Sequence, residues 1–378
     1  MTAIACIEDL RKKAERRVPR MFYEYADSGS WSESTYHANE DDLQAIKFRQ
    51  RVAIDVSQRD TTMEMLGKTV TMPVALAPTG LTGMQHADGE ILAAKAAADF
   101  GVPFTLSTMS ICSIEDVAAN SDAPFWFQLY VMRDRDFIKR LVERARAANC
   151  SALMITLDLQ IMGQRHKDVR NGLSAPPKPT LRNIINLMQK PAWCLGMLGT
   201  KRWQFGNIVG HVKGVKDMSS LADWTVSQFD ASLSWDDVKE IRKQWGGKGI
   251  IKGILDAEDA LAAVNVGADA IVVSNHGGRQ LDGALSSIKA LPAIVDAVGD
   301  KAEVWMDSGI RSGQDVLRAI ALGAQGPLIG RAFLYGLGAN GQAGVTQALE
   351  IIHKELDLTM GLCGQSKLRA VDSSILSQ

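Results

Sequence analysis

Residues 272–282 read VVSNHGGRQLD, and they place side chains that exchange protons and carry charge directly behind an apolar run. Histidine titrates close to neutral pH, so His276 is suited to acid–base chemistry, and Arg279 adds a permanent positive charge three residues later. Of the six histidines, His276 is the one that ends a predicted strand and precedes such an arginine. The segment is therefore predicted to be the working end of an enzyme rather than a polar loop.

Other apolar runs of the chain also end in polar or small residues. In barrels of alternating strands and helices, catalytic groups come from the carboxyl ends of different strands. A single threonine or glutamine at such a place more often caps a loop, but the joint pattern is much less common by chance. These strand-end residues are Thr79, Gly80, Ser107, Gln128, Tyr130, Thr156, Asp158, Lys252, Ser274, Asp307, Gly330 and Arg331.

The last two runs carry a pattern that suits phosphate. DSGIRSG (307–313) places Gly309 and Arg311 just before a predicted helix, and IGRA (329–332) joins Gly330 to Arg331. Barrels commonly bind phosphate on the loops after strands seven and eight, through backbone N–H groups and a helix dipole. The alternative is a pair of ordinary turns with solvated arginines.

The elements that must position these residues form a regular series. Continuous apolar runs alternate with Ala-rich segments of helical spacing, which is typical of a parallel sheet buried on both faces. Eight such units predict an α/β fold of the (β/α)8 TIM-barrel class. The runs are 74–80, 102–108, 124–130, 152–158, 249–255, 270–278, 303–309 and 326–332. Pro327 falls inside the eighth run, where it cannot donate a ladder hydrogen bond.

Two segments interrupt this series. Residues 1–73 form an N-terminal extension, helical and then extended, which we expect to cover the floor or side of the barrel. Residues 159–234 form a long insertion after strand four.

Composition excludes several classes of function. A net charge of −1 gives no global case for binding nucleic acid. The five cysteines form no CxxC pair, and no HxH or HExxH spacing occurs, so neither a disulfide framework nor a metal site is indicated. The GxSxG, P-loop and GxGxxG patterns in their proper contexts are also missing. The N-terminus lacks the apolar stretch of a signal peptide and no run of eighteen apolar residues occurs, which predicts a cytoplasmic protein.

The segment SNHGGRQLD resembles the signature of the FMN-dependent α-hydroxy-acid dehydrogenases and oxidases. The similarity extends from PRMFYEYADSG (19–29) to the helix after strand eight, and is greatest to the bacterial membrane-associated branch that acts on L-lactate or (S)-mandelate. It implies one FMN-binding domain over residues 1–378. By this resemblance His276 is the catalytic base and Asp158 orients it, Arg279 and Arg165 hold the substrate carboxylate, and two phenols touch the substrate. Those phenols belong to Tyr25 and Tyr130.

The same resemblance implies the FMN contacts. Lys252 would stabilise negative charge on the reduced flavin ring. The expected ring contacts are Pro78, Thr79, Gly80, Ser107, Gln128, Thr156 and Lys252. The expected contacts to the ribityl chain and phosphate are Ser274, Asp307, Gly309, Arg311, Gly330 and Arg331.

The implied reaction is oxidation of an (S)-2-hydroxy acid, L-lactate first, to the 2-oxo acid, with electrons passed to a membrane quinone. Gly80 stands where oxidases of the family usually have alanine, which favours this over an oxidase that produces hydrogen peroxide. Met109 occupies a position that varies with the substrate, so (S)-mandelate stays an alternative. Two alternatives lie outside the oxidoreductases: a non-catalytic membrane scaffold and a phosphate-binding isomerase without redox function.

Within the insertion, residues 177–215 are expected to dock on the membrane. They combine an apolar set with a fringe of Lys190, Lys201 and Arg202, a composition that suits a bilayer interface. The apolar set is Trp193, Leu195, Leu198, Trp203 and Ile208. A buried lid on the barrel is the alternative. The resulting expectation is a peripheral protein on the cytoplasmic side of the cell membrane, assembled as a homotetramer.

Overall fold

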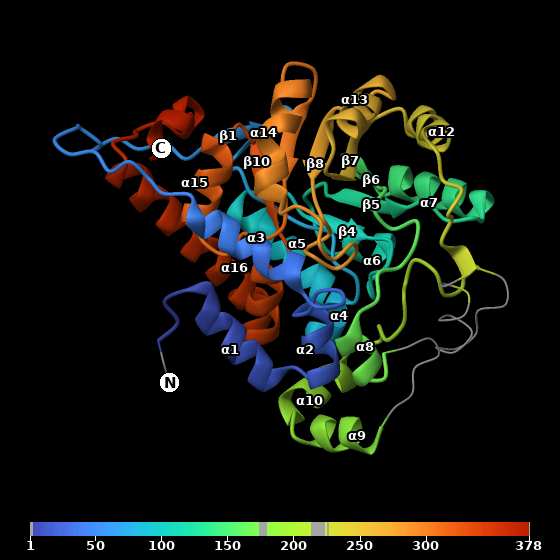
Figure 1. The fold of residues 1–378 in the computed structure, drawn as a ribbon. Coiled ribbons are helices and arrows are strands. Elements are labelled where there is room, and N and C mark those ends of the chain that lie inside the picture. The colour runs from blue at the N-terminus through green and yellow to red at the C-terminus, as the bar shows by residue number, and fades with distance from the viewer. Residues whose placement is uncertain (1–2, 174–179, 213–223, 225–226, 378) are drawn as a thin grey trace.

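The eight predicted strands form one closed parallel sheet in the computed structural model, which describes residues 3–173, 180–212, 224 and 227–377 (Figure 1). The sheet order is β3-β10-β9-β8-β7-β6-β5-β4, and a parallel bridge between Leu76 and Phe104 joins its two ends. The predicted TIM barrel is therefore confirmed. The strands are β3 (Ala75–Leu76), β4 (Thr105–Ser107), β5 (Trp126–Tyr130), β6 (Ala152–Thr156), β7 (Lys248–Ile254), β8 (Ala270–Val273), β9 (Glu303–Met306) and β10 (Gly326–Ile329).

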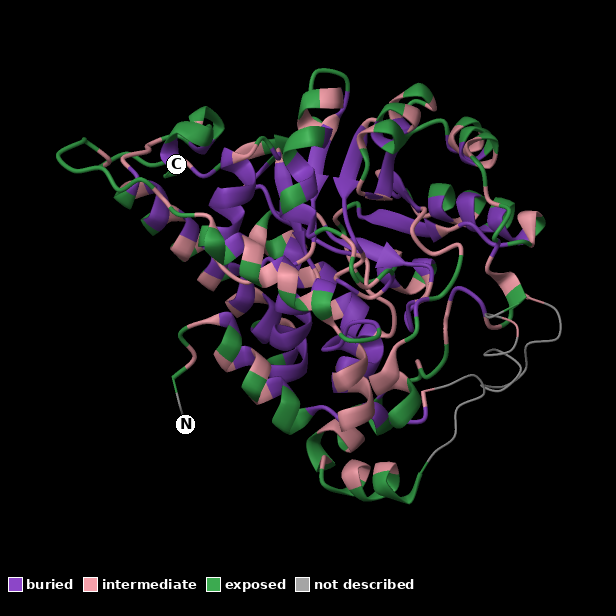
Figure 2. Cartoon of the chain, in the orientation of Figure 1, coloured by how far each residue is buried: buried purple, intermediate pink, exposed green. Residues whose placement is uncertain are grey.

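The strands are apolar throughout because both of their faces are covered. All five residues of β6 are buried, and Figure 2 shows burial along the other strands as well. Pro327 lies inside β10 in register with Met306, and the backbone bonds at both ends of the strand keep it in the sheet despite the missing donor. Inside the barrel, Trp126 and Trp305 stack with ring centroids 5.1 Å apart.

The seam between β3 and β4 is the thinnest part of the sheet. Leu76 N–H donates to the carbonyl of Pro103 at 2.8 Å, and the pairing of β3 with β4 consists of the single bridge between Leu76 and Phe104. Beyond the strands, the buried carboxylate of Glu90 accepts from the N–H of Gly83 at 3.0 Å and from that of Ile111 at 2.9 Å. Glu90 thus ties the loop that follows β3 to the loop that follows β4.

Helices surround the sheet because each carries one apolar face. In α7 (Arg135–Ala147) the buried residues recur at helical spacing, and the Asp134 side chain caps its first turn by accepting from Phe137 N–H at 2.8 Å. The other barrel helices are α4 (Thr82–Gln85), α5 (Gly89–Phe100), α6 (Ile114–Ala118), α12 (Trp235–Trp245), α13 (Ala257–Asn265), α14 (Ser287–Val298), α15 (Gly313–Ala321) and α16 (Arg331–Leu362), followed by the short η1 (Leu368–Ala370) and η2 (Ser373–Ile375).

The N-terminal extension covers more of the barrel than we expected. Its hairpin, β1 (Met63–Met65) and β2 (Lys68–Val70), closes the floor, where Met65 packs with the interior cluster. Of its helices, α1 (Ile7–Arg17) lies along α16, α3 (Ser34–Ala45) packs against α14 and α15, and α2 (Arg20–Ala26) packs against α4 at the opposite end of the barrel. The prediction of a floor or side cover was therefore incomplete, because α2 also contributes to the mouth.

The insertion after β6 contains α8 (His166–Arg170), α9 (Leu181–Met188) and α10 (Pro191–Gly199). Trp193 stacks on Phe22 at 5.5 Å and donates to the carbonyl of Met84, and Ile208 is fully buried. The prediction that these two side chains face outward was wrong, since both anchor the insertion on the barrel. Leu195, Leu198 and Trp203 do lie exposed.

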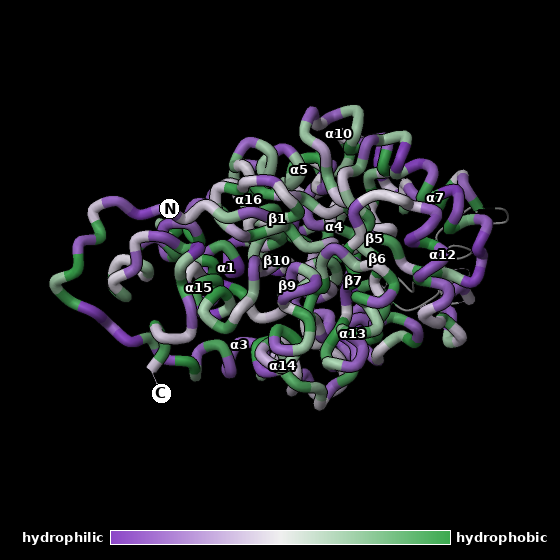
Figure 3. Tube along the Cα trace, turned by 90° about the horizontal axis from the view of Figure 1, so that it is seen from above, coloured by the Kyte–Doolittle hydropathy of each residue, from purple (hydrophilic) through white to green (hydrophobic). Residues whose placement is uncertain are grey.

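Seen from above, α10 lies at the edge of the molecule (Figure 3). The predicted basic fringe is weaker than expected, because Arg202 is paired with Asp88 and Asp116, and Lys190 donates to backbone carbonyls of α1. Lys201 remains exposed. Parts of the expected docking segment, 177–179 and 213–215, lie outside the described residues. Among the described residues no helix is both long and apolar enough to cross a membrane.

Candidate active site

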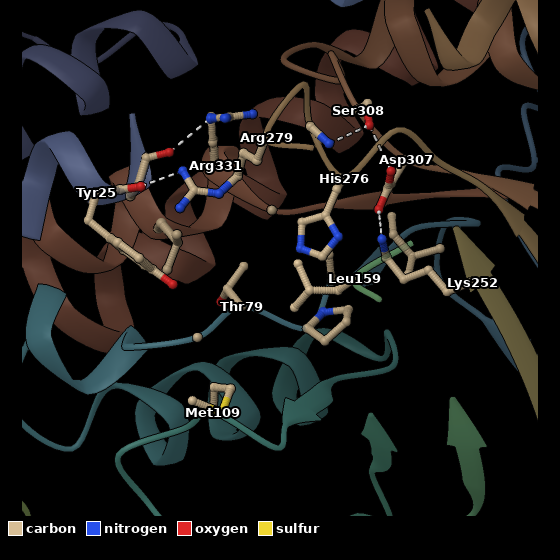
Figure 4. A pocket seen from close by; sticks show the side chains of 18 of the residues that line it. Tyr25, Thr79, Met109, Leu159, Lys252, His276, Arg279, Asp307, Ser308 and Arg331 are labelled. Atoms are coloured by element: carbon tan, nitrogen blue, oxygen red, sulfur yellow. Dashed lines mark hydrogen bonds and ion pairs between the residues drawn. The ribbon is translucent and has the colours of Figure 1, made fainter. Parts of the chain in front are cut away.

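A cavity opens at the carboxyl ends of the strands, where the sequence predicted the chemistry (Figure 4). Strand-end loops, α2 and the insertion all contribute to its wall. The predicted residues that line it are Tyr25, Pro78, Thr79, Gly80, Tyr130, Arg165, Lys252, His276, Arg279, Asp307, Gly309, Arg311, Gly330 and Arg331. The remaining predicted residues, Ser107, Gln128, Thr156, Asp158 and Ser274, lie buried or half-buried in the strands and loops around it.

His276 is carried into the cavity by an unusual turn. Its φ is 60°, and Gly277 and Gly278 follow at 68° and 71°, so three consecutive residues adopt the left-handed conformation. A histidine there is strained, and the surrounding bonds hold it, since its N–H donates to Ser274 Oγ at 3.0 Å. Gly278 is required because a Cβ there would lie 2.5 Å from the backbone nitrogen of Tyr36.

A carboxylate orients the imidazole. Asp158 Oδ1 lies 2.8 Å from His276 Nδ1, which places the ring proton on Nδ1 and leaves the Nε2 lone pair free. Nε2 lies 3.4 Å from the hydroxyl of Tyr130. Burial lowers the pKa of His276 below its ordinary value, although Asp158 partly opposes that shift. Burial would raise the pKa of Asp158, but His276 and Lys252 outweigh it and keep the carboxyl ionised. The histidine is therefore a neutral base at neutral pH.

Lys252 is a buried cation near this pair. Its ammonium lies 2.9 Å from Asp307 and donates to Ser274 Oγ at 2.8 Å. Burial would lower the pKa of Lys252, but Asp307 and Asp158 outweigh it and raise that pKa. The lysine thus stays protonated inside the site.

Arg279 has a buried side-chain nitrogen that makes no hydrogen bond within the described part of the chain. Its Nη1 donates to the backbone carbonyls of Tyr25 at 2.5 Å and Ser28 at 3.0 Å, and its guanidinium lies 4.7 Å from the centre of the Tyr25 ring. Its buried Nη2 has no hydrogen-bond partner among the described residues. Burial and the neighbouring Arg165 lower the pKa of Arg279. A buried donor of this kind is suited to a carboxylate ligand.

Two further arginines line the cavity near β9 and β10. Arg331 is buried and donates to the carbonyls of Ala26 at 2.9 Å and Ser28 at 2.7 Å, and Arg311 pairs with Glu40 at 2.8 Å. The alternative of solvated arginines on ordinary turns is therefore wrong for Arg331. Together with Arg165, Arg279 and Lys252, these side chains make the cavity rich in positive charge.

Comparison with known proteins identifies the family. The sequence profile of the FMN-dependent dehydrogenases matches residues 14–378. The chain belongs to this family. It is 47% identical over 377 residues to an L-lactate dehydrogenase of Caulobacter vibrioides (strain NA1000 / CB15N), covering 99% of this chain and 98% of the relative. It is 48% identical over 375 residues to an L-lactate dehydrogenase of Ectopseudomonas mendocina (strain ymp), again covering 99% and 98%.

Solved structures agree with this assignment. The crystal structure of the monotopic membrane protein (S)-mandelate dehydrogenase matches all of both chains with a TM-score of 0.95 at 35% identity. A mandelate oxidase structure matches 99% of this chain and 98% of its own, with a TM-score of 0.83 at 35% identity. The resemblance found in the sequence is thus confirmed, and FMN is the cofactor of this dehydrogenase.

The residues of this FMN-dependent dehydrogenase fit that cofactor. Gln128 Nε2 and Thr156 Oγ1 are buried without a partner in the described part of the chain, and such polar atoms are expected where a ligand completes the bonding. They would hold the polar edge of the flavin ring. Arg311 and Arg331 supply the positive charge that a phosphate requires.

Some residues of the cavity were not predicted from the sequence. Leu159, Met162, Phe205 and Phe229 come from the insertion and form an apolar wall beside Met109. Their spacing carries no signal, since they come together only through the fold. Ser308 was also missed, although it stands inside the DSG segment. Its φ is 81° and its hydroxyl accepts from Gly277 N–H at 3.0 Å.

Proposed function

We propose that the protein oxidises an (S)-2-hydroxy acid, with L-lactate as the main substrate, to the corresponding 2-oxo acid. The names of its relatives support this substrate. The observation that carries the proposal is the His276–Asp158 pair in the same cavity as the unpartnered Nη2 of Arg279. A neutral base beside a free guanidinium suits an acid whose hydroxyl-bearing carbon is attached to a carboxylate.

The chain's own residues would divide the work as follows. Nε2 of His276 takes a proton from the substrate, and Asp158 stabilises the imidazolium that results. FMN, when bound, would accept the two electrons and the second proton that leave the substrate. Lys252 keeps a positive charge in the site, which favours the arrival of those electrons.

Charged and phenolic side chains would orient the substrate. Arg279 and Arg165 hold the carboxylate, while Tyr25 and Tyr130 contact the carboxylate and hydroxyl. The pKa of Arg279 is lowered because its charge is buried and lies near that of Arg165. A bound carboxylate adds a negative charge beside both arginines and so stabilises their charged forms. The apolar wall around Met109 then receives the side chain of the acid.

Anaerobic bleaching of the flavin tests the substrate. The purified holoprotein is mixed with a panel of (S)-2-hydroxy acids of increasing size, and we expect L-lactate to reduce the flavin with the highest second-order rate constant. Faster reduction by (S)-mandelate would favour that alternative, which the likeness to (S)-mandelate dehydrogenase supports. Bleaching by none of the acids would refute the function.

We propose a membrane quinone rather than oxygen as electron acceptor. Gly80 supports this choice, since an oxidase of the family usually has alanine there. A Cβ at position 80 would lie 3.2 Å from the Tyr25 hydroxyl and 3.3 Å from Met109 Cβ. Reoxidation of the reduced flavin by a soluble quinone analogue is expected to be much faster than reoxidation by air. Equal rates, with stoichiometric hydrogen peroxide, would identify an oxidase instead.

We further propose that α9 and α10 dock the protein, as a homotetramer, on the cytoplasmic face of the membrane. In α9 the exposed apolar residues recur at helical spacing on one stripe, and α10 continues the patch. The patch consists of Leu181, Ile184, Ile185, Met188, Leu195, Leu198 and Trp203.

Flotation with vesicles tests the docking. The double substitution Ile184→Asp and Leu198→Asp is expected to remove most of the vesicle-bound fraction while activity toward L-lactate in solution stays. Leu261→Asp is the matched control, because Leu261 is an exposed apolar residue on α13, remote from the patch. Unchanged flotation of the double variant would contradict the assignment.

A further inference from the structure

A buried carboxylate outside the proposed chemistry receives bonds from four helices. Asp27 Oδ1 accepts from the hydroxyl of Tyr335 at 2.6 Å and from that of Tyr36 at 3.0 Å. Asp27 Oδ2 accepts from the hydroxyl of Tyr23 at 2.8 Å and from Arg11 Nε at 3.0 Å. The donors belong to α16, α3, α2 and α1, and Asp27 is 6% exposed.

The turn that contains this carboxylate supplies the acceptors for two arginines of the cavity. The carbonyls of Tyr25 and Ser28 receive Arg279, and those of Ala26 and Ser28 receive Arg331. The Ser28 carbonyl therefore binds both guanidiniums at once. At the end of a helix these carbonyls lack intrahelical partners, so they are free to accept.

Because two buried cations share the Ser28 carbonyl, their positions depend on how firmly this turn is held. Their mutual repulsion favours any movement of the turn that separates them. Asp27 lies in this turn, its side chain is held by the four donors described above, and its negative charge interacts with that of Arg331. Burial would raise the pKa of Asp27, but the bond from Tyr335 and the charge of Arg11 bring it to about 2. The charge is thus permanent at neutral pH.

We infer that Asp27 is a positioning residue, which fixes the turn after α2 and thereby sets Arg279 toward the substrate carboxylate and Arg331 toward the cofactor phosphate. The inference rests on the proposed function for the roles of the two arginines. It assigns a task in the active site to the N-terminal extension beyond the contribution of Tyr25. The carboxylate itself does not line the cavity, so it acts through the carbonyls.

The variant Asp27→Asn tests this role. It keeps the shape of the side chain but removes its charge. One carboxylate oxygen becomes an amide NH₂ group, which cannot accept from the donors that bond to Asp27. We expect KM for L-lactate and the Kd of oxalate, read from the flavin spectrum, each to rise about tenfold, since a hydrogen bond to a charged group contributes about 1.5–3 kcal/mol. The Kd of FMN for the apoprotein, read by fluorescence quenching, should rise in parallel. By contrast, kcat should stay within about threefold, because the base is untouched.

Two further variants separate positioning from stability. Glu303→Gln alters a half-buried carboxylate on the barrel floor, which accepts from Leu66 N–H at 3.0 Å. It should lower the melting temperature without changing KM for L-lactate or the Kd of oxalate or FMN. Tyr23→Phe removes a single donor of Asp27 and keeps the ring, so it folds more readily than Asp27→Asn. It should raise the same constants about two- to threefold.

The outcomes are distinct. If folded Asp27→Asn and Tyr23→Phe lose thermal stability but keep the oxalate and FMN affinities of the wild type, Asp27 is structural only and the inference is overturned. Absence of flavin bleaching by any hydroxy acid in the wild type would instead refute the proposed function. In that case the action of Asp27 through Arg331 is still tested by comparing the Kd of FMN between Asp27→Asn and the wild type.

Discussion

The two ends of the barrel bury polar groups in opposite ways. At the floor, Glu303 accepts from Leu66 N–H and from Trp305 Nε1 at 3.1 Å, and the stacked Trp126 and Trp305 fill the interior. At the mouth, buried polar atoms of Gln128, Thr156, Asp158 and Arg279 lack partners within the described part of the chain, whereas among the described strand starts only Thr105 Oγ1 does. Such atoms cost free energy in a folded protein, so their concentration at one end indicates where ligands complete the structure.

The difference indicates that polar residues at the floor stabilise the fold, whereas those at the mouth bind ligands. Substitutions at the mouth should therefore change catalysis with little effect on unfolding, and those at the floor should do the reverse. The expected effects are described below from the largest to the smallest.

His276→Gln should give the largest loss. Glutamine cannot take the proton, so we expect the rate of flavin reduction to fall about 10²–10⁴-fold, the usual contribution of a general base. Stopped-flow absorbance under anaerobic conditions measures this rate, and the bound flavin spectrum serves as the control for an intact site. Reduction close to the wild-type rate would exclude His276 as the base.

Asp158→Asn should come next and should also move the pH profile. Loss of the bond to the imidazolium is expected to lower kcat about 10- to 100-fold. The base must be neutral, so kcat/KM rises with pH and levels off above the pKa of His276, which lies below its ordinary value of 6.5. Asp158 raises that pKa, so the variant's acidic limb should move to lower pH. An unchanged limb would show that the carboxylate does not act on the imidazole.

Gly80→Ala should have a moderate effect at the mouth. The new methyl group would press on the Tyr25 hydroxyl and Met109 Cβ, and overpacking of this kind costs about 1–3 kcal/mol. We expect kcat/KM for L-lactate to fall about fivefold, with the FMN content unchanged. Steady-state kinetics on the purified variant would show this, and an unaltered kcat/KM would mean that the loops beside Gly80 move apart freely.

Trp305→Phe tests the floor and should leave turnover unchanged. The variant loses part of the stack on Trp126 and the hydrogen bond from Trp305 Nε1 to Glu303, and together these losses are expected to reduce the free energy of unfolding by about 1–3 kcal/mol. Denaturant unfolding measures that change. A substantial loss of turnover in the folded variant would contradict the division between floor and mouth.

The sequence was sufficient for the barrel and for the placement of its strand ends. Strands buried on both faces read as continuous apolar runs, so all eight could be located, and parallel strands bring their carboxyl ends together without further information. His276 and Lys252 therefore met in one cavity as predicted. Their catalytic roles stay predictions until the variants are measured.

The insertion and the extension were less predictable, because their positions depend on tertiary contacts. Composition placed Trp193 and Ile208 at a bilayer surface, but Trp193 is half-buried against Phe22 and Ile208 is fully buried. No periodicity indicates that Phe205 returns to the cavity, or that α2 ends beside Arg279. Segments outside the repeating units follow packing partners that sequence spacing does not reveal.

The seam between β3 and β4 gives the barrel one adjustable side. Few ladder bonds cross this seam, and the loops that carry Gly80 and Met109 are joined by Glu90 and by the bond from Leu81 N–H to the Met109 carbonyl at 3.0 Å, so a change in this wall need not break a strand. Amide hydrogens along this seam should exchange with solvent sooner than those of β6 or β7. Side chains beside it can change in size while the remaining strands keep their register. The choice of hydroxy acid can therefore change through the side chains of this one wall, without a change of fold.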